Sequence, residues 1–362
     1  MSKVNAKSVF KRRNFMKVNI PTRERGEYRL RLMQDGDAPG VVALYRAIYG
    51  DHYPIREMYD PDYIIRQQEA GAMYRVVVAD AAGNILGHWG MYRLQEAYPG
   101  LYEAGHGMVK AEARAKGFNN AIQAYLIQIL LPAVGGEELW GEGVTNHVFM
   151  QKTMVNAGGN ETGIELELMP AESYETEQSA SGRVSAVVAC VCVKEKPHPV
   201  FLPPPYEEIL KRIYGKAKRD RRLETEAKAL PQKAKTRYVD TYIAAAGVLR
   251  VIVREAGDDA GEVMAGLVKK YMDAGAMVLQ VFLPLHQPWS GALTEVLNRL
   301  GFFFSAVALR WFDTDGLLLQ KLVHPTNYDN IHLHSDFAKE ILNFIIQDRK
   351  RVEAPATKAN DL

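Results

Sequence analysis

The sequence predicts a mixed α/β fold, an α+β arrangement in which helices cover a sheet of parallel and antiparallel strands. Segments with apolar residues at every second position, typical of strands, alternate along the chain with segments whose apolar residues recur every three to four positions, typical of helices. Gly, Pro, Asn and Asp gather between these segments, where turns and helix caps need them. Such alternation favours helices packed on a mixed sheet.

Length and composition narrow the class of protein. A chain of 362 residues suits two domains, because single cores stop growing near about 250–300 residues. The chain is 47% hydrophobic and 24% charged, as in an ordinary soluble globular protein, and a net charge of +2 gives no general attraction to nucleic acid or membranes. No stretch reaches about 18 apolar residues, so we expect no membrane span, no signal peptide and a cytoplasmic protein.

The cysteines and histidines do not form a metal motif. Cys190 and Cys192 are two positions apart in an apolar run, so in a strand they point to opposite faces and can neither pair nor share one metal easily. We interpret them as small core residues in a reducing compartment. His332 and His334 stand apart from other ligands. The sequence therefore predicts no metal site.

The elements of the first half follow from these patterns in order. Residues 28–33 alternate like a strand, and Asp35-Gly-Asp37 caps a helix with Pro39 in its first turn. The same patterns predict a helix at 61–70, strands at 73–80 and 85–94, a strand at 102–109, a helix at 121–130, a strand at 139–145, a helix from Thr145 or Asn146 to Gly158, and strands at 160–169 and 183–194. The order is β-α-α-β-β-β-α-β-α-β-β.

One stretch, residues 108–122, carries the clearest chemical pattern. An apolar strand ending in Val109 runs into a turn with Arg114 and Gly117, and a run of helix formers follows. A strand, a glycine-bearing turn and a helix together point the free backbone N–H groups of the helix start at an anion.

This stretch resembles motif A of the GCN5-related N-acetyltransferase (GNAT) superfamily. That motif reads Val, a few residues, Arg or Gln, two residues, Gly, one residue, and Gly or Ala; Val109, Arg114 and Gly117 match, and Asn119 replaces the second small residue. The element order is the GNAT order, and the helix closed by Gly158 resembles motif B. The resemblance implies a tandem acyl-CoA N-acyltransferase (GNAT) fold whose N-terminal domain covers residues 27–196.

The resemblance also implies a co-substrate, acetyl-CoA or another acyl-CoA, whose pyrophosphate binds the turn amides. The residues expected to contact it are Met108, Val109, Arg114, Ala115, Lys116, Gly117, Phe118, Asn119 and Asn120. The backbone N–H groups of residues 107–109 would form a small oxyanion hole for the thioester carbonyl.

Acyl transfer to an amine needs a base, and three side chains are candidates. Glu103 lies eleven residues before Arg114, the spacing at which histone-type members place a catalytic glutamate. Strand alternation predicts that Glu103 faces the opposite side from His106. His147, near a helix N-terminus, is the third candidate. The alternative for Glu103 is an exposed carboxylate, and for each histidine a structural role.

One feature of the family is missing. Motif B usually carries a Tyr about four residues before its closing Gly, where it protonates the CoA thiolate, and Met154 stands there instead. Three readings stay open: another group donates the proton, the thiolate leaves unprotonated, or the domain binds acyl-CoA without catalysis.

The remaining chain predicts four further regions. We expect a flexible basic arm at 1–26, a Pro-rich and basic helical linker at 197–237, a degenerate GNAT-like domain with a terminal helix at 238–350, and a disordered tail at 351–362. The linker would be either an RNA-binding surface or a solvated helix. In the second half Glu255, Asp258 and Asp259 stand where a pyrophosphate would bind, so their charges predict a non-catalytic repeat.

The expected function is transfer of an acyl group from acyl-CoA to an amine of a small metabolite, with the active site in the N-terminal domain. One alternative is a non-catalytic CoA-sensing or scaffolding protein, and another is an aminoacyl-tRNA-using transferase of the same fold. Nucleic acid is not expected as a partner, and a homodimer is left open.

Overall fold

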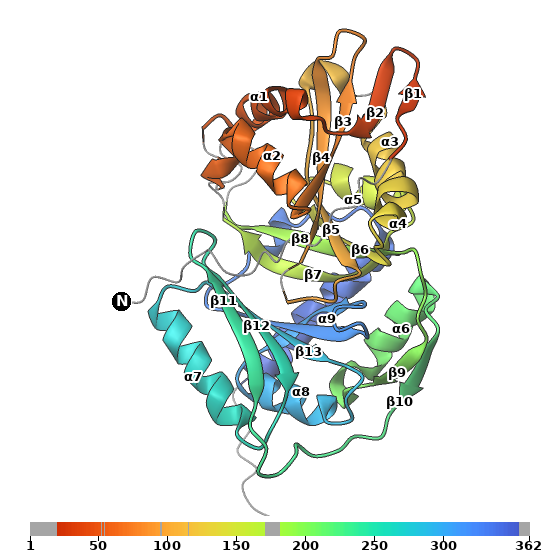
Figure 1. Ribbon diagram of the computed structural model, residues 1–362. Coiled ribbons are helices and arrows are strands. Elements are labelled where there is room, and N and C mark those ends of the chain that lie inside the picture. Colours follow the sequence, from red (N-terminus) through yellow and green to blue (C-terminus); the bar gives the residue numbers. More distant parts are fainter. Residues whose placement is uncertain are drawn as a thin grey trace, which may run out of the picture.

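A computed structural model describes residues 20–51, 53, 55–94, 96–114, 116–170 and 182–354. Its first half follows the predicted element order (Figure 1). The strands there are β1 (Arg23–Arg25), β2 (Tyr28–Leu32), β3 (Met73–Ala79), β4 (Ile85–Arg93), β5 (Leu101–Val109), β6 (Glu138–Val144), β7 (Asn160–Met169) and β8 (Val184–Cys192). The helices are α1 (Ala38–Tyr49), α2 (Pro61–Glu69), α3 (Phe118–Tyr125), α4 (Leu131–Ala133) and α5 (Phe149–Asn156).

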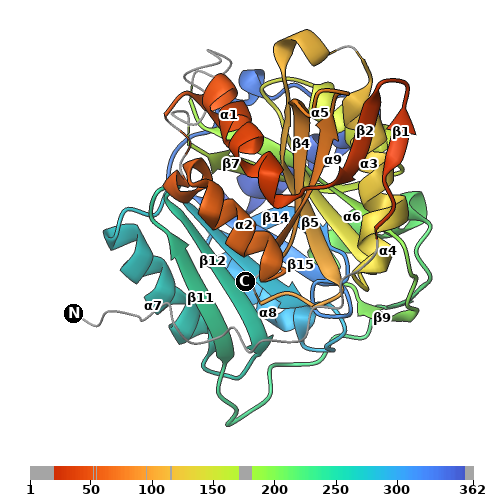
Figure 2. The ribbon, with the colours of Figure 1, turned by 45° about the horizontal axis from the view of Figure 1, so that its top comes forward.

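Helices cover both faces of the first half's strands. Figures 1 and 2 both show α1 and α2 on one side and α3 and α4 on the other. Each side has its own apolar cluster: Val41, Leu44 and Ile64 pack against one face, and Phe118 and Ile122 pack against the other. Burial of these side chains at helical spacing is what fixes the helices to the sheet.

The second half repeats the last part of the first. It comprises strands β11 (Arg237–Ile243), β12 (Val248–Glu255), β13 (Val278–Pro284), β14 (Phe303–Ala308) and β15 (Gly316–Leu322), and helices α7 (Ala260–Asp273), α8 (Ser290–Arg299) and α9 (Asp336–Glu353). β12 and β13 are parallel neighbours. The strand order β11-β12-β13-β15-β14 repeats the order β4-β5-β6-β8-β7 of the first half.

The two halves share one sheet. Among the described residues, 13 strands form a continuous mixed sheet in the order β1-β2-β3-β4-β5-β6-β8-β7-β14-β15-β13-β12-β11, which confirms the predicted fold class. The junction is the antiparallel contact of β7 with β14, where Gly163 pairs with Ala306. A Cβ on Gly163 would lie 2.1 Å from the Ala306 Cβ, so only glycine allows this approach.

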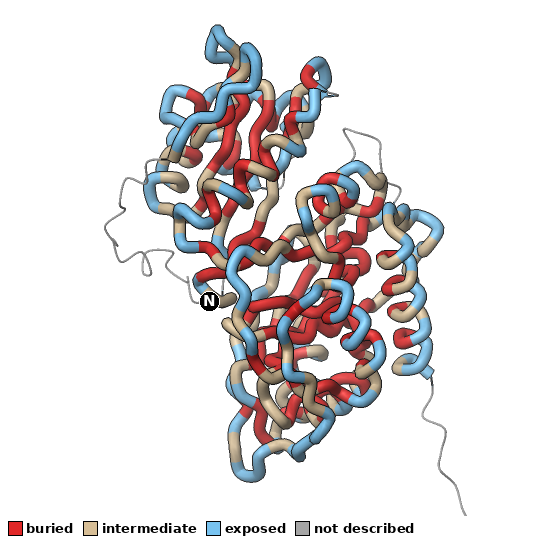
Figure 3. The backbone as a smooth tube through the Cα atoms, turned by 90° about the vertical axis from the view of Figure 1, so that its right-hand side faces the viewer, coloured by how far each residue is buried: buried red, intermediate tan, exposed pale blue. Residues whose placement is uncertain are grey.

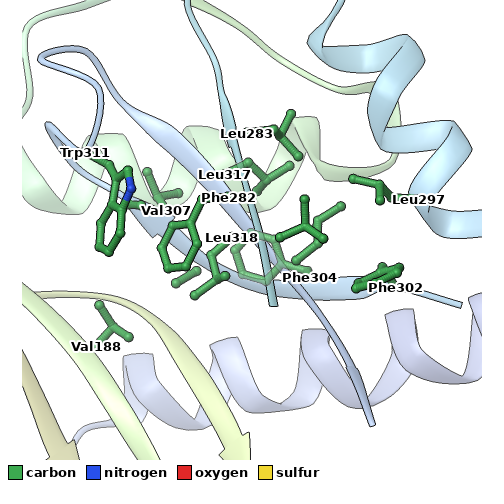
Figure 4. Packing of buried hydrophobic residues seen from close by; sticks show 14 of the residues in the cluster. Val188, Phe282, Leu283, Leu297, Phe302, Phe304, Val307, Trp311, Leu317 and Leu318 are labelled. Atoms are coloured by element: carbon green, nitrogen blue, oxygen red, sulfur yellow. The ribbon is translucent and has the colours of Figure 1, made fainter. Parts of the chain in front are cut away.

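The core continues across the junction. The Trp140 ring of the first half meets the Trp311 ring edge-on, with centroids 5.5 Å apart, and Trp311 stacks on Phe282 at 4.0 Å. Figure 4 shows Trp311 and Phe282 side by side, near Val188 of β8. In Figure 3 the buried segments follow the strands of both halves, whereas the exposed segments are mainly loops and outer helix faces.

Two predicted boundaries need correction. Residues 23–25, expected in the flexible arm, form β1, which pairs with β2; residues 1–19 lie outside the described residues. Residues 351–353, expected in the disordered tail, are the last turn of α9; residues 355–362 lie outside the described residues. The terminal helix is longer than predicted, and Val352 in its added last turn packs, partly buried, against the main core.

The segment 197–237 is folded rather than a solvated linker. It forms β9 (His198–Phe201), α6 (Glu207–Ala217) and β10 (Arg221–Glu224), and β9 pairs with β10 in a small parallel sheet. Ile209, Leu210 and Ile213 of α6 are buried in the main core. The basic composition concealed a helix with one strongly apolar face.

Two helix starts also differ from the prediction. The helix after the glycine-bearing turn begins at Phe118, not Ala121, and passes through a π-helical segment, Leu126–Leu130, before α4. That segment precedes Pro132, which has no N–H for the regular helical ladder. α5 begins at Phe149, three or four residues after the predicted Thr145 or Asn146 cap.

Candidate active site

The site lies where two parallel strands separate. β5 and β6 are paired only from Leu101–Glu138 to Ala104–Gly141, although both continue further. A cavity of about 1190 Å³ lies at this separation and is lined by β5, β6, α3, α5 and the end of α1. On the side that faces β6, the backbone of β5 beyond Ala104 is therefore free to meet a ligand.

The glycine-bearing turn forms one end of the cavity. Gly117 has φ +72°, a left-handed conformation that glycine adopts without strain, and directly precedes α3. The first hydrogen bond into this turn runs from the Ala121 N–H to the Gly117 carbonyl, at 3.2 Å. The N–H groups of residues 118–120 precede it, which makes the helix start a candidate for binding an anion.

The predicted co-substrate residues mostly meet at the cavity. Those that line it are Met108, Val109, Arg114, Gly117, Phe118, Asn119 and Asn120. Lys116 does not line the cavity, because its Nζ donates to the Tyr28 hydroxyl at 2.6 Å. Ala115 lies outside the described residues.

A cation that the sequence analysis placed in the arm stands at the turn instead. The Arg25 Nη1 of β1 donates to the Gly117 carbonyl at 2.9 Å, and the guanidinium is exposed. No local sequence pattern predicts that Arg25 contacts the turn, because its position depends on the pairing of β1 with β2. Arg25 therefore adds a positive charge at the turn, although it does not itself line the cavity as Arg114 does.

A bulge in β5 changes the predicted orientation of His106. His106 has φ +55°, and the register against β4 shifts between His88–Met108 and Gly90–Gly105. This extra residue breaks the alternation, so Glu103 and His106 share a face rather than opposing each other. Tyr92 contacts both: its hydroxyl donates to Glu103 and its ring lies edge-on to His106, with centroids 5.5 Å apart.

His106 lies among aromatic side chains. Its Nδ1 is 3.0 Å from the Tyr45 hydroxyl and 2.7 Å from the Tyr53 hydroxyl. Burial, together with the nearby Arg75 guanidinium, lowers the pKa of His106 to about 4. The imidazole is therefore neutral near pH 7 and lines the cavity as a hydrogen-bonding group.

Glu103 is buried rather than exposed. It is 8% exposed, and the Tyr92 hydroxyl donates to its Oε1 at 2.5 Å. Burial and the neighbouring Glu142 carboxylate raise the pKa of Glu103 to about 8. A carboxylate with this pKa is a stronger base than an exposed one.

Glu142 was missed by the sequence analysis. It lines the cavity, and its Oε1 accepts a hydrogen bond from the Trp140 Nε1 at 3.1 Å. Gly141 and Gly143 flank it on β6, which keeps both neighbouring positions free of side chains. The sequence pattern that could have identified Glu142 is a carboxylate between two glycines in a predicted strand.

His147 and Met154 both line the cavity on the side of α5. His147 lies in the loop before α5, with its ring centroid 5.4 Å from that of Phe149. Its Nδ1 has no hydrogen-bond partner among the described residues. Met154 packs against Gly141 and Gly143 and offers no proton. The catalytic roles of Glu103, His106 and His147 stay predictions.

The corresponding turn of the second half is occupied by the chain itself. The Lys233 N–H donates to Asp258 at 2.9 Å, and the Thr236 N–H and hydroxyl both donate to Asp259 at 2.8 Å. The Gly257 N–H donates to the Thr236 hydroxyl at 3.1 Å. Residues at the end of segment 197–237 therefore fill the place where a phosphate would approach.

Metal-binding clusters and membrane spans are both absent from the described residues. None of their His, Cys, Asp and Glu side chains form a group of three or more that could hold a metal ion. None of the helices in this part of the chain is both long and apolar enough to cross a membrane.

The fold and the site define an α/β protein in which two parallel strands, β5 and β6, separate beside the start of helix α3. No family model matches the sequence, and no curated protein matches it either. Over about half of its length the chain is similar to solved structures of N-acetyltransferases, GNAT proteins among them.

Three of these structures illustrate the similarity. Ribosomal-protein-S5-alanine acetyltransferase from Vibrio fischeri is 12% identical, with 48% of this chain and 96% of that chain covered and a TM-score of 0.40. Spermidine N-acetyltransferase from Vibrio cholerae is 15% identical, with 46% and 95% covered and a TM-score of 0.36. A GCN5-related N-acetyltransferase from Kribbella flavida is 21% identical, with 46% and 98% covered and a TM-score of 0.36.

Proposed function

We propose that the first half is an acyl-CoA-dependent N-acyltransferase, with acetyl-CoA as the simplest donor and an amine of a small metabolite as the acceptor. The observation that carries this proposal is the single cavity that joins the glycine-bearing turn to the open edge of β5 and to the carboxylate side of β6. The turn suits a pyrophosphate and the strand edge suits a thioester carbonyl. The far side carries Glu142, a neighbour of the proposed base Glu103, which does not itself line the cavity.

In the proposed reaction the amine nitrogen attacks the thioester carbonyl. A C–N bond forms, the C–S bond breaks, and the thiolate of CoA leaves. Glu103 takes the proton that the ammonium loses, directly or through a water molecule. The free N–H groups of β5 stabilise the oxyanion that forms on the carbonyl oxygen. His106 and its tyrosine neighbours would contact the acceptor from the side of α1.

A specific observation favours a second candidate, a protein that binds acyl-CoA without turnover. Met154 occupies the wall of the cavity where the family usually places the proton donor for the thiolate. The second half supports the same idea, since its own turn is occupied by the chain. In this case the protein would sense acyl-CoA or act as a scaffold, and acyl-CoA would not be consumed.

The RNA-using alternative receives less support. The basic residues of segment 197–237 are largely engaged in ion pairs, such as Arg219 with Glu138 and Arg221 with Asp315. Arg212 pairs with Glu340. Charges held in this way are not free to bind phosphates.

Calorimetry with acetyl-CoA followed by thiol release against a set of amines tests the proposal. Binding together with amine-dependent thiol release is the expected result. Binding without release from any amine favours the non-catalytic candidate. Absence of binding by a folded protein overturns both.

A further inference from the structure

The second half reaches into the proposed acid–base centre of the first. Arg250 of β12 lies with its Nη2 3.5 Å from an Oε1 of Glu142 and 3.6 Å from an Oε1 of Glu165. Its Nε donates to the Oε1 of Gln280 at 2.9 Å, and the Gln280 Nε2 donates to Glu165 at 2.7 Å. Two side chains of the second half thus hold two carboxylates of the first.

The arrangement has more carboxylates than cations. Glu103, Glu142 and Glu165 come from β5, β6 and β7, and Arg250 is the cation that faces them. Glu165 is fully buried, and its Oε2 has no hydrogen-bond partner among the described residues. Burial and the neighbouring Glu142 carboxylate raise the pKa of Glu165 well above its usual range.

Arg250 does not line the cavity, but it contacts Glu142, which does. Its side chain is 21% exposed and that of Glu142, which lines the cavity, is 18% exposed. The groups that face Glu103 are the Tyr92 hydroxyl from β4, Glu142 from β6 and Arg250 from β12. Of these, Glu142 disfavours ionisation of Glu103 and the guanidinium favours it.

We propose that Arg250 is a positioning residue for Glu103, so that the second half completes the active site of the first rather than serving only as a structural repeat. Gln280 fixes the guanidinium, the guanidinium holds Glu142 and Glu165 in place, and the positive charge keeps Glu103, a neighbour of the cavity-lining Glu142, able to ionise. The inference rests on the proposed N-acyltransferase function for its kinetic test, but not for its titration test.

Arg250→Gln tests this role through two pH profiles. Loss of the positive charge should move the acidic limb of kcat/KM to higher pH, because the guanidinium favours the ionised form of Glu103. At pH 7 the rate should fall by about tenfold for each pH unit of this movement. Arg250→Lys keeps the charge without the planar fork and should restore part of the shift.

Arg254→Gln is the matched control. Arg254 lies on the same strand and also crosses to the first half, where its Nη2 contacts Glu96 at 3.0 Å. It does not face Glu103, so its variant should keep the wild-type pH profile. Acetyl-CoA affinity, measured by calorimetry, should be unchanged in both variants.

A substrate-free titration separates this inference from the proposed function. Carbon-detected NMR of glutamate carboxyls, with Glu103→Gln to identify the resonance, should show the Glu103 titration moving upward in Arg250→Gln and not in Arg254→Gln. If wild type shows no amine-dependent turnover and this movement is seen, the proposed function fails and the role of Arg250 stands.

An unchanged Glu103 titration in folded Arg250→Gln overturns the inference, whatever the activity. Should Arg250→Gln fail to fold, Gln280→Met gives the second comparison, since it removes the anchor of the guanidinium but keeps the charge. A smaller shift in the same direction is expected there, and an unchanged titration in Gln280→Met again overturns the inference.

Discussion

At the scale of single residues, burial separates the two basic groups of the site. The pKa of Glu103 is raised to about 8, whereas that of His106 is lowered to about 4. An alkylammonium, with a pKa near about 10, gives its proton more readily to a carboxylate of pKa about 8 than to an ordinary one. We therefore propose Glu103 as the base, with His106 contributing hydrogen bonds.

Replacing Glu103 with Gln should lower kcat by about 10²–10⁴-fold, because the amide keeps the size but cannot accept the proton. In wild type, kcat/KM should rise through about pH 8, where Glu103 loses its proton, and the variant should lose this limb. Steady-state kinetics across pH, with acetyl-CoA binding as the control, provides the measurement. Normal turnover of Glu103→Gln together with inactive His147→Ala would transfer the role to His147.

The same pKa predicts a pH dependence of stability. Because the folded-state pKa of Glu103 lies above the ordinary value of 4.5, the folded protein binds an extra proton between about pH 4.5 and about pH 8. This contribution to stability is fully present below pH 4.5 and is lost as the pH rises through about 8. Relative to wild type, Glu103→Gln should therefore gain a few degrees in Tm on going from about pH 6 to about pH 9.

Thermal unfolding of wild type and Glu103→Gln between about pH 6 and about pH 9 tests this pH dependence of stability. A constant difference in Tm would mean that Glu103 titrates at its ordinary pKa. The Tyr92 hydroxyl can donate to the amide oxygen as it does to the carboxylate, so loss of that hydrogen bond should not obscure the comparison.

At the scale of elements, local patterns predicted most strands and helices because apolar periodicity is local. The predictions were wrong where a long-range contact determines the structure. Residues 23–25 are polar and become a strand only by pairing with β2. The basic helix α6 is held in the fold by its buried apolar face. The bulge at His106 was equally hidden, since it appears only in the register against β4. The turn at Gly117 was predictable because its conformation is a local requirement.

Gly117→Val should abolish acetyl-CoA binding. At φ +72° a β-branched residue is strained, and its side chain would stand beside the Arg25 guanidinium, 3.1 Å from the new Cβ. Gly135→Val is the matched control, because Gly135 also has a positive φ, +74°, but has open space around it and does not line the cavity. Calorimetry should show binding in the control alone; wild-type affinity in folded Gly117→Val would exclude this turn as the site.

Strand β1 should contribute to the same binding step. Arg25→Ala removes the exposed guanidinium at the Gly117 carbonyl, so acetyl-CoA affinity should fall by about tenfold, equivalent to about 1.4 kcal/mol. Arg23→Ala, on the same strand but absent from the turn contacts, should bind as wild type. The difference should shrink at high salt, because an exposed charge is screened. Equal affinities for both variants would contradict a role for Arg25.

At the scale of the whole molecule, the sequence did not predict that the two halves share one sheet. The repeat in the second half could be anticipated from the sequence, but the β7–β14 contact joins residues 143 positions apart. Two small residues, Gly163 and Ala306, carry that contact, and small residues are also common in strands that make no such close approach. The role of Arg250 depends on this junction and was hidden with it.

Gly163→Ala should destabilise the protein by at least about 2 kcal/mol. The new Cβ would lie 2.1 Å from the Ala306 Cβ and 2.3 Å from the Ser305 carbonyl oxygen, so backbone must move. Gly215→Ala, in α6 with open space around it, should instead stabilise by about 0.5–1 kcal/mol. Urea unfolding gives both values, and equal effects would show that the junction tolerates a side chain.

The single sheet also changes how the molecule meets its neighbours in solution. Two separate sheets would present four outer strands, each with unpaired backbone groups that invite another chain. In the main sheet of the described residues only β1 and β11 remain at the outside, and both carry charged side chains, Arg23, Glu24 and Arg25 on one and Arg237 and Asp240 on the other. Because the two halves share one sheet, two outer strands are exposed instead of four. The charged side chains on β1 and β11 disfavour edge-to-edge aggregation at these two strands.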